Sequence, residues 1–578
     1  MNIPELLPYP KKLALQPGHA SSRRTTRRSL DAFKTAGAYR VTITPKGTAL
    51  EAADEAGLFY AEQTLKQIDQ QFPKGRPCLT IEDWPDYPVR GFYHDVTRGK
   101  VPTLETLREL ANQCAHYKLN QLQLYIEHTY AFKKHPEVWQ GADPLTADEI
   151  RELDDHCAAL HIDLVPSFST FGHFYTWIHH KFPELNELER DVSQEPECWW
   201  DRMAHYTLDC RNPKSLRLVK EIIREVRPLF RSRYFNICAD ETFDLGKGRN
   251  KAEAERVGVG RLYVDFLKAI MAEVKKVKAI PMFWGDVIGA HPELINEIPA
   301  EAIALDWDYS PKVGHSKASL MRKSGRRFYV CPGITGWNNW IPDYANAAKN
   351  IGRFARYGQQ EGASGLLNTD WGDFGHIQTL GSSLPGMVFG ACVSWGTKHN
   401  YASIRSLIST KVWGDRSGRL LGILEDAVSS RKASWQIVAF AHEPRFYGMP
   451  DTWIDAKTGL PDGLMASPPA KHRRALQRIR TLQKQALPLI RALPCPLLAA
   501  ELKVGLQGLI AMEEYYLVVR TKALGQTCNL VKPTQATRHL RELAKGLEAV
   551  WLRRNKRSEL DRILAVLEAA ARQCMASV

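Results

Sequence analysis

Two adjacent carboxylates, Asp240 and Glu241, directly follow a short apolar run that begins at Tyr234. The run has the character of a buried strand, and a loop containing Gly246 and Gly248 comes after the acids. Ligands and chemistry are found at the carboxyl ends of parallel strands. Two acids this close repel each other, so one is expected to keep its proton near neutral pH and to donate it. The pattern predicts a general acid, although an isolated Asp-Glu pair is more often a solvated turn.

Eight segments with strand character lie between residues 88 and 400, and helical patterns separate most of them. They are centred on 91–96, 119–126, 162–168, 234–239, 280–284, 303–307, 327–331 and 365–368. A capping-box signature from Thr146 to Glu149 marks the start of one intervening helix. Eight such units in succession predict a (β/α)8 barrel, whose active site is built at the strand carboxyl ends.

Polar and aromatic residues gather at one end of these strands, and a barrel kept only for stability has no need of them. Besides the acid pair they are Asp95, Arg98, Glu127, His128, His173, Trp284, Asp286, Trp307, Tyr309, Trp337, Trp340, Asp370, Trp371 and Asp373. Indole faces commonly form walls for ring-shaped ligands such as sugars, although core packing explains any single one. The loop 181–212 is long for a barrel connection and contains Trp199 and Trp200, so we expect it to overhang the pocket.

The chain divides into three predicted parts, with a small α+β domain in front of the barrel and helices behind it. Residues 1–86 contain the alternating segment 39–44, typical of a half-buried strand, and a helical pattern over 56–68. Residues 87–400 form the predicted barrel. Residues 401–578 show amphipathic helical stripes, which indicate a helical domain packed on the barrel.

Composition excludes several classes of protein. The net charge of +14 is spread along the 578 residues without any nucleic-acid-binding motif, so we expect a solvated basic surface and no nucleic-acid partner. The eleven cysteines include no Cys-x-x-Cys pair, so neither a disulfide framework nor a structural zinc site is predicted. The N-terminal residues lack a signal-peptide pattern, and no apolar run has membrane-spanning length. A cytoplasmic location is therefore expected.

Four segments together resemble glycoside hydrolase family 20, the β-N-acetylhexosaminidases, and within it a branch similar to hexosaminidase D. Residues 88–98 look like the family's first strand, Arg-Gly-x-x-x-Asp-x-x-Arg, and residues 117–129 are similar to its second. Residues 165–173 resemble the third strand, which ends in Gly-His, and Asp240-Glu241 matches the family's acid pair. Ser167, Ser169 and Phe171 depart from the usual third strand.

The resemblance implies hydrolysis of terminal β-linked GlcNAc or GalNAc with retention of configuration, without a cofactor or metal. The substrate's 2-acetamido oxygen would attack the anomeric carbon and give an oxazolinium intermediate, as family 20 does without an enzyme nucleophile. Glu241 would be the general acid and Asp240 would orient the acetamido group. Arg90 matches the arginine that holds ring hydroxyls. The remaining expected substrate contacts are Glu127, His173, Trp284, Trp307, Tyr309, Trp337, Trp371 and Asp373, of which Glu127 and His173 could instead form a polar chain behind Glu241.

Two other functions stay open from the residues alone. A metal-dependent hydrolase on the same barrel could use His128, His173 and Asp240 as ligands, although no strand carries the His-x-His pair that such sites usually contain. A decayed enzyme could bind carbohydrate without catalysis, since fold does not guarantee function. The partner expected in either carbohydrate case is an oligosaccharide or glycoconjugate with a terminal N-acetylhexosamine. The oligomeric state is not predicted.

Overall fold

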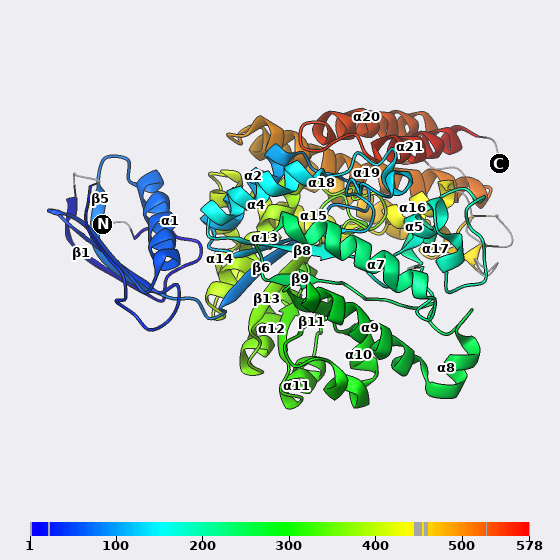
Figure 1. The fold of residues 1–578 in the computed structure, drawn as a ribbon. Coiled ribbons are helices and arrows are strands. Elements are labelled where there is room, and N and C mark those ends of the chain that lie inside the picture. Colours follow the sequence, from blue (N-terminus) through cyan, green and yellow to red (C-terminus); the bar gives the residue numbers. More distant parts are fainter. Residues whose placement is uncertain are drawn as a thin grey trace.

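A computed structural model describes residues 3–20, 24–204, 206–443, 453–455, 460–526 and 529–576. Figure 1 shows a small sheet domain at one end, a central barrel with its helices, and a layer of long helices formed by the C-terminal part of the chain. Within the described ranges, no helix combines the length and apolar character needed to span a bilayer. The three-part arrangement agrees with the fold expected from the sequence.

The N-terminal domain is a five-stranded sheet with one helix on it. The strands are β1 (Lys12–Ala20), β2 (Thr25–Ser29), β3 (Tyr39–Thr44), β4 (Gly47–Ala52) and β5 (Arg76–Asp83), in the order β1-β5-β3-β4-β2. Helix α1 (Glu55–Gln71) begins at Asp54, whose side chain accepts a hydrogen bond from the Gly57 amide. Val41 and Ile43 alternate with half-buried neighbours and pack under this helix, as the period-two pattern predicted.

Eight parallel strands close the barrel. In chain order they are β6 (Val89–Asp95), β7 (Gln121–Ile126), β8 (Asp163–Phe168), β9 (Tyr234–Asn236), β10 (Ile280–Trp284), β11 (Ile303–Trp307), β12 (Arg327–Cys331) and β13 (Gly365–Asp370), with β13 paired to β6. The predicted strand set is confirmed. β9 is shorter than expected because the backbone turns into the left-handed region at Cys238 and Ala239, where a strand cannot continue.

The helices that surround the barrel follow the expected apolar spacing. The principal ones are α2 (Leu104–His116), α4 (Ala147–Ala159), α7 (Pro213–Val226), α9 (Val259–Lys276), α12 (Tyr344–Gln360) and α13 (Leu380–Trp395). The capping box at Thr146 and Glu149 is present, with both reciprocal hydrogen bonds formed. In α7, Val219, Ile222 and Val226 are buried on the face that packs on the barrel.

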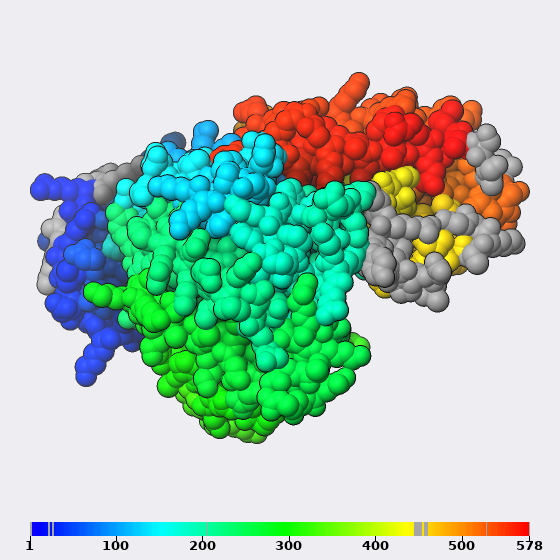
Figure 2. Space-filling view, turned by 45° about the vertical axis from the view of Figure 1, so that its right-hand side comes forward, coloured from blue at the N-terminus to red at the C-terminus, as the bar shows by residue number. Residues whose placement is uncertain are grey.

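The C-terminal part is helical and packs along one side of the barrel. Its helices include α14 (Tyr401–Trp413), α15 (Leu420–Ser430), α16 (Trp435–His442), α18 (Pro469–Arg491), α19 (Pro496–Ala523), α20 (Pro533–Trp551) and α21 (Leu560–Met575). α19 lies between α18 and α20, so most of its side chains are buried. Figure 2 shows the last helices, in red, running across the upper edge of the molecule beside the barrel.

Candidate active site

A pocket of about 200 Å³ opens at the carboxyl ends of the barrel strands. This is less than the roughly 300–1,000 Å³ of common ligand pockets, so it suits a single sugar ring better than a chain. Eight of the residues expected from the sequence line it together with Arg98 and Met203. The eight are Asp240, Glu241, Trp284, Trp307, Tyr309, Trp337, Trp371 and Asp373.

The acid pair lies on a strained piece of backbone. Cys238, Ala239 and Glu241 have φ of 55°, 66° and 49°, in a region that residues other than glycine seldom adopt. Asp286 Oδ2 accepts a hydrogen bond from the Glu241 amide at 3.0 Å and supports the turn from the next strand end. A Cβ at Gly172 would collide with the carbonyl oxygen of Asp240, so only glycine allows this approach. This strained backbone therefore directs both carboxylates into the same pocket.

His173 joins the two acids. Its Nε2 lies 3.3 Å from Asp240 Oδ2 and 3.5 Å from Glu241 Oε2. Burial alone would lower the pKa of His173, but the Asp240 and Glu241 carboxylates outweigh it and raise the pKa to about 10. Arg98 Nη2, 3.2 Å from Nδ1, opposes a proton on that nitrogen because two N–H groups cannot share one hydrogen bond. In either protonation state, His173 therefore keeps a proton on Nε2, facing the acid pair.

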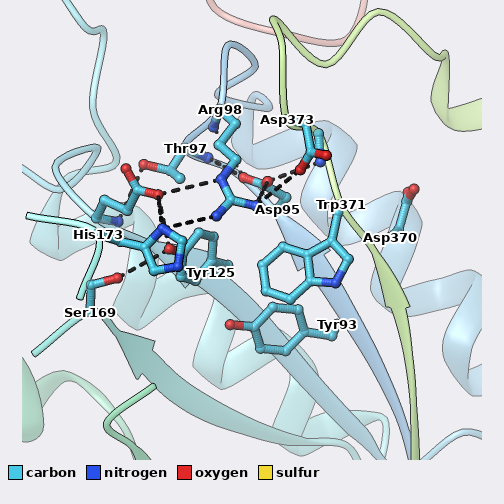
Figure 3. Close-up of polar contacts among 12 residues, drawn as sticks. Tyr93, Asp95, Thr97, Arg98, Tyr125, Ser169, His173, Asp370, Trp371 and Asp373 are labelled. Carbon is cyan, nitrogen blue, oxygen red and sulfur yellow. Dashed lines mark hydrogen bonds and ion pairs between the residues drawn. The ribbon is translucent and has the colours of Figure 1, made fainter. Parts of the chain in front are cut away.

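Arg98 is the central cation of the site (Figure 3). Its guanidinium lies between His173 and Asp373, with Nη1 3.1 Å from Asp373 Oδ1. The rings of Tyr125 and Trp371 flank it, each centroid 5.1 Å from Cζ. The sequence contained the signal for this residue, since Arg98 ends the first-strand motif and follows the strand by three positions. Arg98 was nevertheless not among the predicted substrate contacts.

The structure corrects the prediction that Arg90 contacts the ring hydroxyls of the sugar. Arg90 stands at the other end of β6, is 1% exposed, and faces the N-terminal domain. Its guanidinium donates to the backbone oxygens of Lys118 and Tyr87 and to the Tyr60 hydroxyl, at 2.8–2.9 Å. Arg90 therefore fixes the domain contact and cannot reach the pocket.

Glu127 and His173 were predicted as substrate contacts, and the structure places them behind the pocket wall. Glu127 is 3% exposed and receives a hydrogen bond of 2.9 Å from the Tyr125 hydroxyl. It lies 3.4 Å from Arg98 Nε and 3.8 Å from His173 Nδ1. This is the polar chain that the sequence offered as the other possibility. Its members position the acid pair and Arg98.

Aromatic rings form most of the remaining wall. Trp307 stacks on Tyr309 with a centroid distance of 5.2 Å, and Tyr309 contacts Trp337. The Trp371 indole donates to the Tyr309 hydroxyl at 2.6 Å. Two buried polar atoms on this wall, Trp284 Nε1 and Asp240 Oδ1, have no hydrogen-bond partner among the described residues. Buried polar groups rarely stay unsatisfied, so a ligand that both accepts and donates hydrogen bonds fits here.

Two further carboxyls at the site hold protons more tightly than usual. Burial, reinforced by the nearby Asp240 and Glu241 carboxylates, raises the pKa of Asp286 to about 7. Burial also raises the pKa of Asp373 to about 6, although Arg98 opposes the shift. The site therefore changes its charge between pH 6 and 7. Asp286 was noted at a strand end in the sequence but was not predicted as a site residue.

The loop 181–212 reaches the pocket through Met203, as its length suggested. Met203 ends the short helix α6 (Trp199–Met203), and the structure anchors this helix to the C-terminal part of the chain. Trp199 Nε1 donates to Glu559 at 2.9 Å, and Arg202 Nη2 lies 2.7 Å from the same carboxylate. Trp199 itself is buried and does not line the pocket. Sequence could not single out Met203 because nothing in its type marks it.

A metal site at the acid pair remains geometrically open. Ligand atoms of His173, Asp240 and Glu241 all lie within 4.8 Å of one another. His128, the third ligand of the metal-dependent alternative, is not a member of this group. It is buried 3.4 Å from the Thr97 hydroxyl and near Arg202. The ligand set proposed from the sequence is therefore not brought together.

Matches to known families agree with the barrel and its acid pair. Residues 87–337 match the model of the glycosyl hydrolase family 20 catalytic domain, and residues 9–84 match the model of domain 2 of the same family. The chain belongs to glycosyl hydrolase family 20. The family models stop before the C-terminal helices.

Individual relatives are distant. A β-hexosaminidase of Akkermansia muciniphila is 29% identical over 198 residues, which are 28% of this chain and 40% of the relative. Hexosaminidase D of Bos taurus is 24% identical over 309 residues, 50% of this chain and 86% of the relative. The chain thus spans well under half of the first of these relatives and most of the second.

Solved structures support the fold. The chitobiase of Flavobacterium johnsoniae superposes with a TM-score of 0.60 over 94% of this chain and 99% of its own, at 16% identity. A β-N-acetylhexosaminidase of Bacteroides fragilis gives a TM-score of 0.57 over 72% of this chain and 96% of its own, at 18% identity. At these identities the likeness concerns the fold alone.

Proposed function

We propose that this protein is a retaining exo-β-N-acetylhexosaminidase that removes terminal β-linked GlcNAc or GalNAc by substrate-assisted catalysis. The single observation that carries the proposal is the pairing of Asp240 and Glu241 around His173 Nε2, at 3.3 and 3.5 Å, in a pocket sized for one sugar. Family membership and the hexosaminidase names of the relatives support the same reaction.

The reaction assigns a different task to each acid. Glu241, which is partly exposed, protonates the glycosidic oxygen and later activates water. Asp240, which is 6% exposed, accepts the acetamido N–H through Oδ1, an atom without a hydrogen-bond partner among the described residues, and stabilises the developing positive charge. The acetamido oxygen then attacks the anomeric carbon, and the bond to the leaving oxygen breaks as Glu241 donates its proton. Asp286 holds the Glu241 amide and so fixes the direction of the acid.

The pocket walls confine the reacting group. Trp284, Trp307 and Trp371 surround the space next to Asp240, which keeps the acetamido oxygen close to the anomeric carbon. Arg98 and Asp373 form a charged pair that can bind ring hydroxyls on the opposite side. With one ring filling about 200 Å³, the rest of the substrate extends outward, and this supports exo-action.

A panel of four 4-nitrophenyl β-glycosides tests the proposal: GlcNAc, GalNAc, glucose and galactose. The two acetylated sugars should be hydrolysed and the two others should be nearly inert, because only the former carry the internal nucleophile. Equal rates on all four would refute substrate assistance, and no hydrolysis of any would support the non-catalytic binding protein.

The metal-dependent alternative is tested separately. His173, Asp240 and Glu241 could place three ligands around an ion, so the enzyme should be dialysed against a chelator and assayed. Full activity after dialysis is the expected result. Activity that is lost and then restored by a divalent ion would favour the metal-dependent hydrolase.

A further inference from the structure

Three hollows adjoin one another from the active site to the C-terminal helices. Trp337 lines both the sugar pocket and a second cavity of about 530 Å³. Lys432 lines that second cavity and also a third, of about 540 Å³. Each shared residue lines two hollows, so the hollows are neighbours in space. The hollows therefore follow one another from the acid pair, over the barrel loop after β12, to α15 and α18, which pack against each other.

The second cavity is lined mainly by uncharged polar groups. Its lining residues include Asn338, Asn339, Gln436, Thr335, Ser429 and Ser434. Its ionic residues largely neutralise each other, since Arg431 pairs with Asp343 at 3.7 Å. Asn338 Oδ1 is buried without a hydrogen-bond partner among the described residues, and its Nδ2 reaches Gln436 Oε1 only at 3.5 Å. Amides and hydroxyls beside an indole are the groups that bind sugar hydroxyls and ring faces.

The third cavity is cationic. Lys471, Arg474 and Arg478 occupy one face of α18 at spacings of three and four residues, and all are exposed. Lys432 joins them from just beyond α15, and no carboxylate is among the described residues that line the cavity. Among the described residues, Arg478 alone of these four side chains forms an ion pair, with Asp426 at 3.8 Å, and the Lys432 backbone amide donates to Glu513. Like charges gathered this closely repel each other, so an anion in the cavity would relieve the repulsion.

We infer that these hollows form an extended aglycone site, which binds a longer glycan whose distal sugars carry an anionic group such as sulfate or carboxylate. The inference rests on the proposed function, because the reducing side of a cleaved glycan must leave the sugar pocket by this or another route. Trp337 would stack on the sugar next to the cut bond, the amides would bind neutral hydroxyls, and the α18 cations would bind the anion. The cationic part lies in the C-terminal helices, beyond the residues that match the family models.

The experiment compares two β-GlcNAc-terminated oligosaccharides that differ only in one sulfate on a sugar distant from the cut bond. The test variant is Lys471→Gln/Arg474→Gln/Arg478→Gln. A matched control is Arg538→Gln/Arg541→Gln/Lys545→Gln, which removes the same three charges at the same spacing from exposed positions of α20. Both retain the sugar pocket, so 4-nitrophenyl β-GlcNAc reports the proposed function independently.

The wild type should have a lower KM for the sulfated substrate than for its neutral twin, and the advantage should fade as salt rises. The α18 variant should lose about tenfold of that advantage, and the α20 control should keep it. Unchanged discrimination in the α18 variant, with intact aryl-glycoside activity, would overturn the aglycone site alone. Equal loss in both variants would show a general charge effect and overturn it as well. A wild type inert on aryl glycosides would instead count against the proposed function.

Discussion

The Asp286 carboxylate accepts the backbone N–H of Glu241 at 3.0 Å, across the gap between two neighbouring strand ends. This contact holds Glu241 in the left-handed conformation, with φ of 49°. The same carboxyl group lies near the Trp307 indole, whose nitrogen is 3.4 Å from Asp286 Oδ1. One partly buried acid thus links the proposed general acid to the aromatic wall of the pocket, and its protonation should affect the stability of both parts of the site.

Asp286→Asn should stabilise the protein at alkaline pH. Because the pKa of Asp286 is about 7 in the folded protein, above its value in an unfolded chain, the group binds its proton more tightly when folded. The stability it contributes is present below pH of about 4 and is lost as the pH rises through 7. Asparagine keeps an oxygen for the Glu241 amide and never ionises. Melting curves should therefore show a higher Tm for the variant at pH 8 and no difference at pH 4.

An exposed carboxylate gives the control for this measurement. Asp265→Asn removes an acid with a side chain that is 59% exposed on α9, and its Tm difference should not follow the same pH course. If Asp286→Asn were equally stable relative to the wild type at both pH values, the raised pKa of Asp286 would be wrong.

Arg98→Lys and Arg90→Lys should distinguish the roles of the two arginines in the first-strand motif. A lysine cannot contact Asp373 and His173 in one plane or stack between Tyr125 and Trp371, so kcat/KM should fall about 100-fold. Arg90→Lys should lower Tm, because Arg90 is buried at the domain contact, and change kcat/KM less than about threefold. Steady-state kinetics with 4-nitrophenyl β-GlcNAc measures both. A large kinetic loss in Arg90→Lys alone would restore the original prediction.

Glu241→Gln should affect substrates according to their leaving groups. Protonation of the departing oxygen is worth about 10²–10⁴-fold when the leaving group is poor and much less when it is good. Hydrolysis of a disaccharide should nearly stop, while 2,4-dinitrophenyl β-GlcNAc should retain most of its rate. Equal losses on both substrates would place the acid elsewhere.

Asp240→Asn should weaken a thiazoline inhibitor that mimics the fused ring of the intermediate. Asp240 is proposed to act on the acetamido group, so good and poor leaving groups should slow alike. Inhibition constants for the wild type, Asp240→Asn and Glu241→Gln provide the comparison. If thiazoline binding survived in Asp240→Asn and disappeared in Glu241→Gln, the two roles would be reversed.

Sequence predicted the barrel because its signal is periodic and local. Three strands, β10, β11 and β12, have the bounds that were expected, since apolar runs end there at turn residues. β9 was predicted too long because a left-handed backbone at Cys238 and Ala239 has no signature in residue type. Strain of this kind depends on contacts made by distant residues, here Gly172 and Asp286.

The error over Arg90 has a geometric origin. Arg90 and Arg98 belong to one motif, and each is a reasonable ligand for sugar hydroxyls. A strand rises about 3.3 Å per residue, so Arg90, near the start of β6, and Arg98, just beyond its end, lie at opposite ends of the barrel. Which of the two arginines reaches the sugar pocket depends only on where the strand ends. Met203 was missed for another reason, because its place in the pocket depends on how Arg202 and Trp199 bind Glu559.

The most direct test of the account uses three aryl β-glycosides with N-acetyl, N-fluoroacetyl and N-trifluoroacetyl groups at C2. Fluorine withdraws electrons from the amide oxygen, which makes it a poorer nucleophile, and the N-fluoroacetyl group stays close to N-acetyl in size while the N-trifluoroacetyl group is larger. If the substrate's own amide attacks the anomeric carbon beside Asp240 and Glu241, kcat/KM should fall steeply along the series, by about 100-fold or more. A series with equal kcat/KM values would contradict substrate-assisted catalysis and with it the proposed function of the acid pair.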